Sequence, residues 1–353
     1  MTEMNATIDA RAIANIRGIA LDGPHNARSG HQGTAMSLAP LAHVLWSRIM
    51  KFDAENPDWF DRDRFILSPG HASILEYTLL YLYGFGLEME DLKNFRQFGS
   101  KTPGHPELGH TVGVEVTTGP LGAGFSNGVG LAIAEESLRA RLGSEVCDHY
   151  IYGICSDGDM EEGISHEAAS LAGHLGLGRL IFIYDDNEIS IDGRTDLAFS
   201  DDTAARFRAY NWDVQEVGEI AEDLDALEAA INAAKAVTDK PSMIVLKTKV
   251  AFPAPKSTDD YHAHGYSIFD EEIAETKEIL GLPVDETFTV EDDVLSACRA
   301  SGIRSRSEQV AWQSRLDGYS GDRAVLDALL NTCLLYTSPS PRDATLSRMP
   351  SSA

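Results

Sequence analysis

Two acidic clusters stand where apolar segments of the sequence stop. Asp157 follows the apolar run 150–155, and Asn187 follows the run 180–184. Ligands of open parallel sheets bind at the carboxyl ends of the strands, so the two side chains are expected to meet at that edge. A carboxylate, a carboxamide oxygen and a loop carbonyl are hard ligands that suit Mg²⁺ and leave positions for phosphate oxygens. Gly158 would let the backbone approach such a phosphate, because it carries no Cβ.

A glycine-rich turn precedes a long helical pattern. Residues 119–124 read Gly-Pro-Leu-Gly-Ala-Gly and lead into a helix expected over 125–141. A turn of this kind offers free N–H groups and the positive end of a helix dipole to an anion. Its spacing is not the dinucleotide-binding fingerprint, and a packing turn explains it equally well.

Four of the histidines lie in loops beside glycine. They are His31, His71, His105 and His264. Histidine exchanges protons near neutral pH and donates hydrogen bonds to phosphate or hydroxyl oxygens, so the group suggests a binding site with proton transfer. Any one of them alone is more often a surface or capping residue. His43, His149 and His174 fall in periodic or apolar segments and are interpreted as structural.

The elements that position these side chains follow from the apolar patterns. Helix-period spacing predicts helices, and short apolar runs predict strands buried on both faces of a parallel sheet. The predicted helices cover 10–20, 35–50, 73–84, 125–141, 165–175 and 224–237, and the predicted strands cover 64–68, 150–155, 180–184 and 243–247. The alternation predicts an α/β fold in which helices cover a parallel sheet.

Composition excludes some functions. The chain has 353 residues, with 29 Lys and Arg against 55 Asp and Glu, and a formal charge of −26. Such an acidic surface repels nucleic-acid phosphates and anionic lipids, so neither nucleic acid nor a membrane is expected as a partner. No signal peptide or membrane span is expected, and the four cysteines lack metal or disulfide spacing, which indicates the cytoplasm.

Several segments together resemble the transketolase family. Ser156-Asp157-Gly158 with Asn187 resembles the thiamine diphosphate fingerprint, in which Gly-Asp-Gly is followed by a distant asparagine. Other similar segments occur in the same order along 13–319, namely Ser-Gly-His at 29–31, Leu-Ser-Pro-Gly-His-Ala at 67–72, Thr-Pro-Gly-His-Pro-Glu at 102–107, Thr-Gly-Pro-Leu-Gly at 118–122, Met-Glu-Glu-Gly at 160–163 and Ile-Asp-Gly at 191–193. Ser156 replaces the first glycine, and the loop 252–256 also departs from the family pattern, which leaves His262 as an alternative to His264.

The resemblance implies a role for each matching residue. Asp157, Asn187 and the carbonyl of Ile189 would ligate Mg²⁺ or another divalent cation such as Ca²⁺ or Mn²⁺. The residues implied to contact thiamine diphosphate are His71, Gly119, Leu121, Gly158, Asn187, Ile191 and His264. The residues implied to take part in catalysis are His31, His105 and His264 at the substrate, and Glu162 in a carboxylate network between two subunits.

The implied activity is a two-carbon ketol transfer from a ketose phosphate to an aldose phosphate, in the pentose phosphate pathway, by a homodimer. On this interpretation 1–280 is the cofactor-binding domain, 281–332 is a linker with the start of a second domain, and 333–353 is a non-native tail that resembles a translated sequencing adapter. The second domain would supply the carboxylate that activates the aminopyrimidine and the arginines that bind the substrate phosphate. The chain alone is therefore expected to lack turnover.

Three alternatives stay open at this point. Another thiamine enzyme, such as a dihydroxyacetone synthase or a deoxyxylulose phosphate synthase, would share the metal fingerprint. The chain would also fit the natural N-terminal subunit of a split enzyme that works only with a partner chain. An unrelated nucleotide-binding α/β protein is the third, although the sequence has no dinucleotide glycine motif after its first strand.

Overall fold

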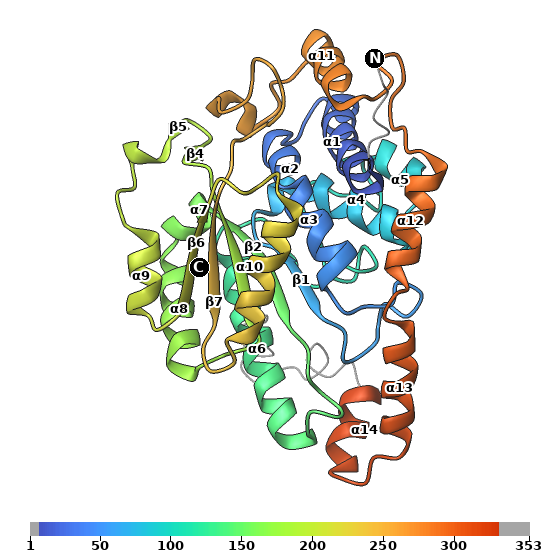
Figure 1. The fold of residues 1–353 in the computed structure, drawn as a ribbon, viewed down its shortest axis with the longest axis vertical. Coiled ribbons are helices and arrows are strands. Elements are labelled where there is room, and N and C mark those ends of the chain that lie inside the picture. Colours follow the sequence, from blue (N-terminus) through green and yellow to red (C-terminus); the bar gives the residue numbers. More distant parts are fainter. Residues whose placement is uncertain (1–6, 332–353) are drawn as a thin grey trace, which may run out of the picture.

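The computed structural model describes residues 7–331 and is built around a five-stranded sheet (Figure 1). The strand order is β1-β2-β3-β7-β6, and every neighbouring pair is parallel. The strands are β1 (Arg64–Leu67), β2 (Ile151–Ser156), β3 (Leu180–Asp186), β6 (Asp213–Gly218) and β7 (Ser242–Lys247), and a separate antiparallel pair is formed by β4 (Ile189–Ser190) and β5 (Gly193–Arg194). The predicted α/β fold with a parallel sheet is confirmed.

Helices cover both faces of this sheet. One layer contains α6 (Ala123–Leu142), α8 (Gly163–Leu175) and α9 (Thr203–Ala209). The opposite layer contains α1 (Ile8–Ala27), α2 (Gly33–Ser37), α3 (Ala39–Val44), the π-helical turn η1 (Leu45–Ile49), α4 (Ser73–Tyr83) and α10 (Leu224–Ala236). Short elements between them are η2 (Gly70–Ala72), α5 (Met89–Lys93), α7 (Asp157–Glu161), η3 (Thr195–Leu197) and η4 (Tyr261–His264).

Two hydrophobic cores lie on either side of the sheet. Along β3, Phe182 and Tyr184 belong to the core under α6 and α8, whereas Ile181 and Ile183 belong to the core under α1, α3 and α4. Successive strand residues point to opposite faces, so a strand covered on both sides must be apolar at every position. This is why β3 is a continuous apolar run in the sequence.

The structure differs from the sequence prediction in one helix and in one strand. The single helix expected over 35–50 is divided into α2, α3 and η1. Pro40 explains the first break, because proline has no N–H to donate to the preceding helical turn. The edge strand β6 was not predicted, because its residues are half-exposed or exposed and form no apolar run.

The segment after residue 280 is helical and packs on the N-terminal layer. It contains α12 (Asp292–Gly302), α13 (Arg306–Asp317) and α14 (Arg323–Asn331), and α11 (Asp270–Leu280) precedes it. Helix α12 contacts α1 and α4, and the indole of Trp312 in α13 packs against Trp59 and Phe60. The predicted tail 333–353 lies outside the described residues.

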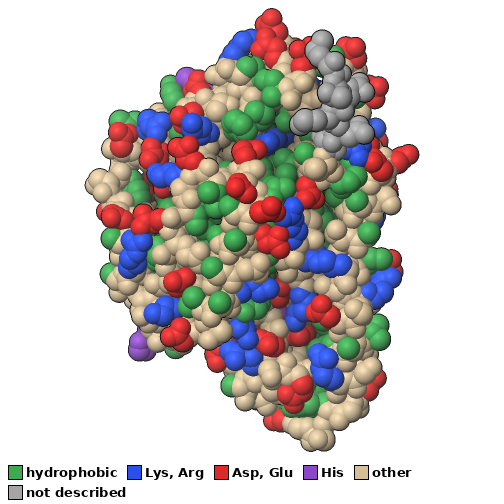
Figure 2. Space-filling view, viewed as in Figure 1, with side chains coloured by type: hydrophobic (Ala, Val, Ile, Leu, Met, Phe, Trp, Pro, Cys, Tyr) green, Lys and Arg blue, Asp and Glu red, His purple; other side chains and the backbone are tan. Residues whose placement is uncertain are grey.

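Acidic and basic side chains are interspersed over the face drawn in Figure 2. Within residues 7–331, none of the helices has the combination of length and apolar character needed to cross a bilayer.

Candidate active site

The carboxyl ends of β1, β2 and β3 meet at one edge of the sheet. In the parallel register Leu67 pairs with Ile154, and Ser156 pairs with Asp185. The loops that leave these strands therefore start side by side, which is the geometry that creates ligand sites in open α/β sheets.

Asp157 is buried at this edge and is held by neutral donors. Its Oδ1 accepts a 2.6 Å hydrogen bond from the Tyr184 hydroxyl. Its Oδ2 accepts from the backbone N–H groups of Asn187, at 3.3 Å, and Glu188, at 3.1 Å. Burial raises the pKa of Asp157 to about 7, and the nearby carboxylates of Asp185 and Asp186 add to the rise. A bound cation would favour the ionised form of this carboxyl group.

The Asn187 side chain is fixed by its neighbours. Its Nδ2 donates to Asp185 Oδ2 at 2.9 Å, and its Oδ1 accepts from the backbone N–H of Ile189 at 2.9 Å. Asp185 is fully buried and also accepts a hydrogen bond from the Thr248 hydroxyl. The structure thus places one carboxylate and one carboxamide oxygen on adjacent loops, which is a donor set that fits a hard divalent cation.

Asp159 joins three segments of the site and was not identified from the sequence. Its Oδ1 accepts hydrogen bonds from the Ser68 hydroxyl and the Gly122 N–H, both at 2.7 Å, and its Oδ2 accepts from the Ser156 N–H at 2.9 Å. The carboxylate therefore ties the ends of β1 and β2 to the glycine-rich turn. The available signal was Ser156 followed three residues later by an acid, which is the pattern of a capping box.

The glycine-rich turn packs closely against the site. The N–H of Gly122 is bonded to Asp159, and the N–H of Phe125 donates to the Ser68 hydroxyl at 2.9 Å. These N–H groups serve packing rather than a free anion, which favours the second of the two interpretations given above. A Cβ on Gly158 would lie 2.7 Å from Leu121 Cδ1, so only glycine fits there without a shift of Leu121.

Three of the four predicted histidines form a cluster. The ring centroids of His31 and His71 are 4.8 Å apart, those of His71 and His264 are 4.8 Å apart, and those of His31 and His264 are 5.5 Å apart. His262 is instead exposed and pairs with Asp260 at 2.8 Å. The structure therefore brings His264, and not His262, to the cluster.

The clustered imidazoles are neutral at neutral pH. Burial lowers the pKa of His31 to about 4, with repulsion from His264 as a further cause, and burial also lowers the pKa values of His71 and His264. The buried Nδ1 of His31 has no hydrogen-bond partner. A buried polar atom without a partner is costly, so this atom is suited to receive a group of a bound ligand.

His105 lies beside this cluster and brings an unpredicted arginine with it. The ring of His105 faces Gly119, whose Cβ position lies 3.5 Å from the ring. The Arg96 guanidinium lies 3.1 Å from the Cβ position of Gly104, and its charge contributes to the lowered pKa values of His31 and His105. Arg96 was not predicted from the sequence, because one basic residue in a loop has no distinguishing spacing.

Of the remaining predicted residues, two are exposed and Ile189 is buried. The side chain of Ile191 is exposed, and so is that of Glu162, which precedes α8 as its N-cap residue. Ile189 lies in β4, paired with Arg194 of β5. The roles predicted for these residues concern groups outside this chain or ligands, and they stay predictions.

Comparison with known proteins shows the family of this chain. Residues 8–339 match the family model described as the transketolase thiamine diphosphate-binding domain. The transketolase of Mycobacterium tuberculosis strain H37Rv is 47% identical over 345 residues, which are 96% of this chain and 49% of that protein. The transketolase of Geobacillus stearothermophilus is 43% identical over 347 residues, covering 97% of this chain and 52% of that protein.

Solved structures agree with the sequence relatives. The transketolase of Campylobacter jejuni superposes with a TM-score of 0.88 at 39% identity, over 93% of this chain and 51% of that chain. The transketolase of Leishmania mexicana gives a TM-score of 0.85 at 45% identity, over 89% of this chain and 47% of that chain. The chain thus spans about half the length of the curated relatives it matches.

Proposed function

The chain belongs to the transketolase family through its thiamine diphosphate-binding domain, and from this premise we propose that it is the cofactor-binding N-terminal half of a transketolase. The complete enzyme would transfer a two-carbon ketol unit from a ketose phosphate to an aldose phosphate, a reaction of the pentose phosphate pathway. The observation that carries the proposal is the meeting of Asp157, Asn187 and the histidine cluster at one edge of the sheet.

The residues of this edge fit the metal and the cofactor diphosphate. Asp157, Asn187 and the carbonyl of Ile189 would hold Mg²⁺ or a similar divalent cation, since Mg²⁺ takes a few oxygen ligands and completes its shell with phosphate and water. His71 and His264, with Gly158, would lie at the diphosphate. Thiamine diphosphate supplies, when bound, the nucleophilic carbon of its thiazolium ring.

The neutral histidines would accept protons from the sugar hydroxyls and donate protons to them. A neutral imidazole accepts a proton at one nitrogen while it donates a hydrogen bond from the other. The unpartnered Nδ1 of His31 is free to take either role, and burial keeps this imidazole uncharged. His105 would contact the substrate next to it, and Arg96 would oppose protonation of both rings.

A second subunit would complete the site. Helix α8 exposes the apolar side chains of Ile164, Leu171 and Leu175, and Glu162 immediately precedes it. A homodimer contact over α8 would bury these side chains and bring Glu162 to the subunit boundary.

The unpaired thiols of Cys147, Cys155 and Cys298 fit a reducing compartment such as the cytoplasm.

The proposal is tested by titrating the purified chain with thiamine diphosphate in a calorimeter, with and without Mg²⁺. Binding should require Mg²⁺ in the wild-type chain, and Asp157→Asn should remove the Mg²⁺-dependent component. Asp225→Asn is the matched control, because the Asp225 carboxylate is exposed on α10. Equal Mg²⁺ dependence in Asp157→Asn and the wild type would contradict the assignment of the metal ligand.

A separate experiment tests whether the chain alone has transketolase activity. The chain alone should give no ketol transfer between sugar phosphates, because the missing half would supply the phosphate-binding arginines. Turnover by the purified chain alone would refute the proposal that it is only the cofactor-binding half.

A further inference from the structure

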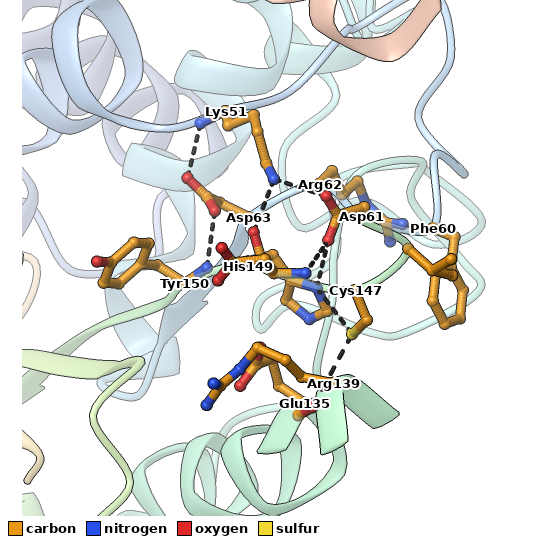
Figure 3. Close-up of polar contacts among 12 residues, drawn as sticks. Lys51, Phe60, Asp61, Arg62, Asp63, Glu135, Arg139, Cys147, His149 and Tyr150 are labelled. Atoms are coloured by element: carbon orange, nitrogen blue, oxygen red, sulfur yellow. Dashed lines mark hydrogen bonds and ion pairs between the residues drawn. The ribbon is translucent and has the colours of Figure 1, made fainter. Parts of the chain in front are cut away.

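A second cluster of metal-ligating side chains lies at the opposite edge of the sheet from the candidate active site (Figure 3). Asp61 belongs to the loop that enters β1, and Cys147 and His149 belong to the loop that enters β2. The active-site residues follow the carboxyl ends of the same strands. The two clusters are thus separated by the length of the sheet.

The three side chains are close enough to share one ion. One donor atom from each, an oxygen, a sulfur and a nitrogen, lies within 4.8 Å of the other two. His149 Nδ1 is 3.3 Å from Asp61 Oδ1 and 3.8 Å from Cys147 Sγ. Tetrahedral Zn²⁺, with its usual bond lengths, separates such donors by about 3.3–3.6 Å, so only small shifts are needed.

The surroundings hold the donors in place. The backbone N–H of Asp148 donates to Asp61 Oδ1 at 2.6 Å, and Lys51 Nζ binds the other oxygen, Oδ2, at 2.8 Å. Asp61, Cys147 and His149 are all buried. Hydrogen bonds that orient buried ligands are typical of metal sites, and with three protein donors water would take the fourth tetrahedral position.

A further carboxyl group, that of Glu135, is buried beside the cluster. The Cys147 thiol lies 3.9 Å from the carbonyl oxygen of Glu135, and the Glu135 side chain is fully buried. Glu135 Oε1 accepts from Arg139 Nε at 3.0 Å, but the buried Oε2 has no hydrogen-bond partner. An unpartnered buried carboxylate oxygen is costly, and a cation in the cluster would offset that cost.

We propose that Asp61, Cys147 and His149 form a structural site for a borderline-soft divalent cation, with Zn²⁺ as the natural occupant. Mixed sulfur, nitrogen and oxygen donors select such ions over Mg²⁺ or Ca²⁺. On binding, the Cys147 S–H bond breaks and the proton leaves to solvent, while His149 coordinates through Nδ1 and keeps its proton on Nε2. The ion would join the loops that precede β1 and β2, next to the place where Trp312 Nε1 donates to the Val146 carbonyl.

The test uses Co²⁺ as a spectroscopic probe of the purified full chain under reducing conditions. We expect one Co²⁺ per chain, with the thiolate-to-metal charge-transfer band and the intense visible bands of a tetrahedral site. Cys147→Val and His149→Gln should each remove the charge-transfer band or weaken Co²⁺ affinity at least 100-fold. Zn²⁺ added in equal amount should displace the Co²⁺.

Matched controls separate this site from the others. Cys298→Ala, a buried cysteine outside the cluster, and Cys333→Ser should leave the band unchanged. Asp157→Asn should also leave it unchanged, so failure of the active-site assignment is distinguishable. Circular dichroism checks that each variant is folded. If Cys147→Val does not fold, His149→Gln replaces it as the test variant. Absence of a thiolate band in the wild type, or its persistence in folded Cys147→Val, would overturn the proposal.

Discussion

The two edges of the sheet carry similar side chains but stabilise their charges differently. At the carboxyl edge, Asp157 and Asp185 accept hydrogen bonds only from neutral groups among the described residues, and burial raises their pKa values to about 7 and about 6. At the amino edge, Asp61 pairs with Lys51, and its pKa is lowered despite burial. Among the described residues, Asp157 and Asp185 therefore have no cationic hydrogen-bond partner, whereas Asp61 has one, and a bound cation would favour the ionised form of Asp157.

The two edges also offer different donor atoms. At the amino edge, burial raises the pKa of the Cys147 thiol to about 12, and the nearby carboxylates of Glu135 and Asp61 add to the rise. Thiolate ligands favour borderline-soft ions, whereas the oxygens of Asp157 and Asn187 favour hard ones. The two edges are thus expected to differ in metal preference.

The largest expected effect comes from the carboxylate that holds the active-site loops together. Asp159→Ala removes the acceptor for Ser68, Gly122 and Ser156 and leaves their donors buried without partners. The free energy of unfolding should fall by about 3–5 kcal/mol, measured by urea denaturation. Glu161→Ala, an exposed acid in the same helix, is the control. A loss below about 1 kcal/mol would mean that Asp159 does not organise this edge.

A second prediction compares the two edges directly in the metal-free chain. Asp61→Asn removes the partner of Lys51 and should cost about 2–4 kcal/mol of unfolding free energy. Asp157→Asn removes a buried carboxylate that has no cationic partner and should cost less than about 1 kcal/mol. Equal losses in the two variants, measured by urea denaturation above pH 8 with a chelator present, would remove the distinction between the edges.

A third prediction distinguishes His264 from His262 as the histidine that contacts the cofactor at the carboxyl edge. His264→Ala should weaken Mg²⁺-dependent binding of thiamine diphosphate about tenfold, because a hydrogen bond to a charged group is lost. His262→Ala should leave the affinity within about twofold, since His262 is exposed and lies outside the cluster. Calorimetric titration of both variants measures the two affinities. A larger loss of affinity in His262→Ala than in His264→Ala would assign the cofactor contact to His262.

A fourth prediction concerns the pH dependence of stability that His31 contributes. Its pKa is lowered from 6.5 to about 4 in the folded chain. Between these values the unfolded chain binds a proton that the folded chain does not, so stability falls as the pH falls from about 6.5 to about 4. His31→Asn should reduce this slope in urea denaturation measured across that range. An unchanged slope would mean that the imidazole is protonated in the folded chain.

The sequence predicted those parts of the fold that depend on local apolar patterns. The strands β1, β2, β3 and β7 and the helix between β2 and β3 follow from such runs. Because that strand–helix–strand unit is parallel, it also places Asp157 and Asn187 at one edge, as the sequence predicted. The exposed edge strand β6 and the break at Pro40 were missed, because tertiary position rather than periodicity decides them.

The site was only partly predictable for a different reason. The spacing of Ser156 and Asp159 indicates only a local capping box, whereas the hydrogen bonds that Asp159 accepts from Ser68 and Gly122 join residues that are far apart in the chain. The cluster at the amino edge was even less predictable from the sequence. Cys147 and His149 are two residues apart, but Asp61 comes from another strand's loop, so neither cysteine spacing nor histidine context indicated a site. His149 was interpreted as structural on that context alone.

The most direct test of the central claim is a crystal structure of the chain with Mn²⁺ and thiamine diphosphate. Anomalous scattering locates the metal without assumptions about its ligands. We expect one Mn²⁺ peak within about 2.5 Å of an Asp157 carboxylate oxygen and of Asn187 Oδ1, with diphosphate oxygens in the same shell. A cofactor-bound Mn²⁺ elsewhere on the sheet, or one contacting only one of these two side chains, would contradict it.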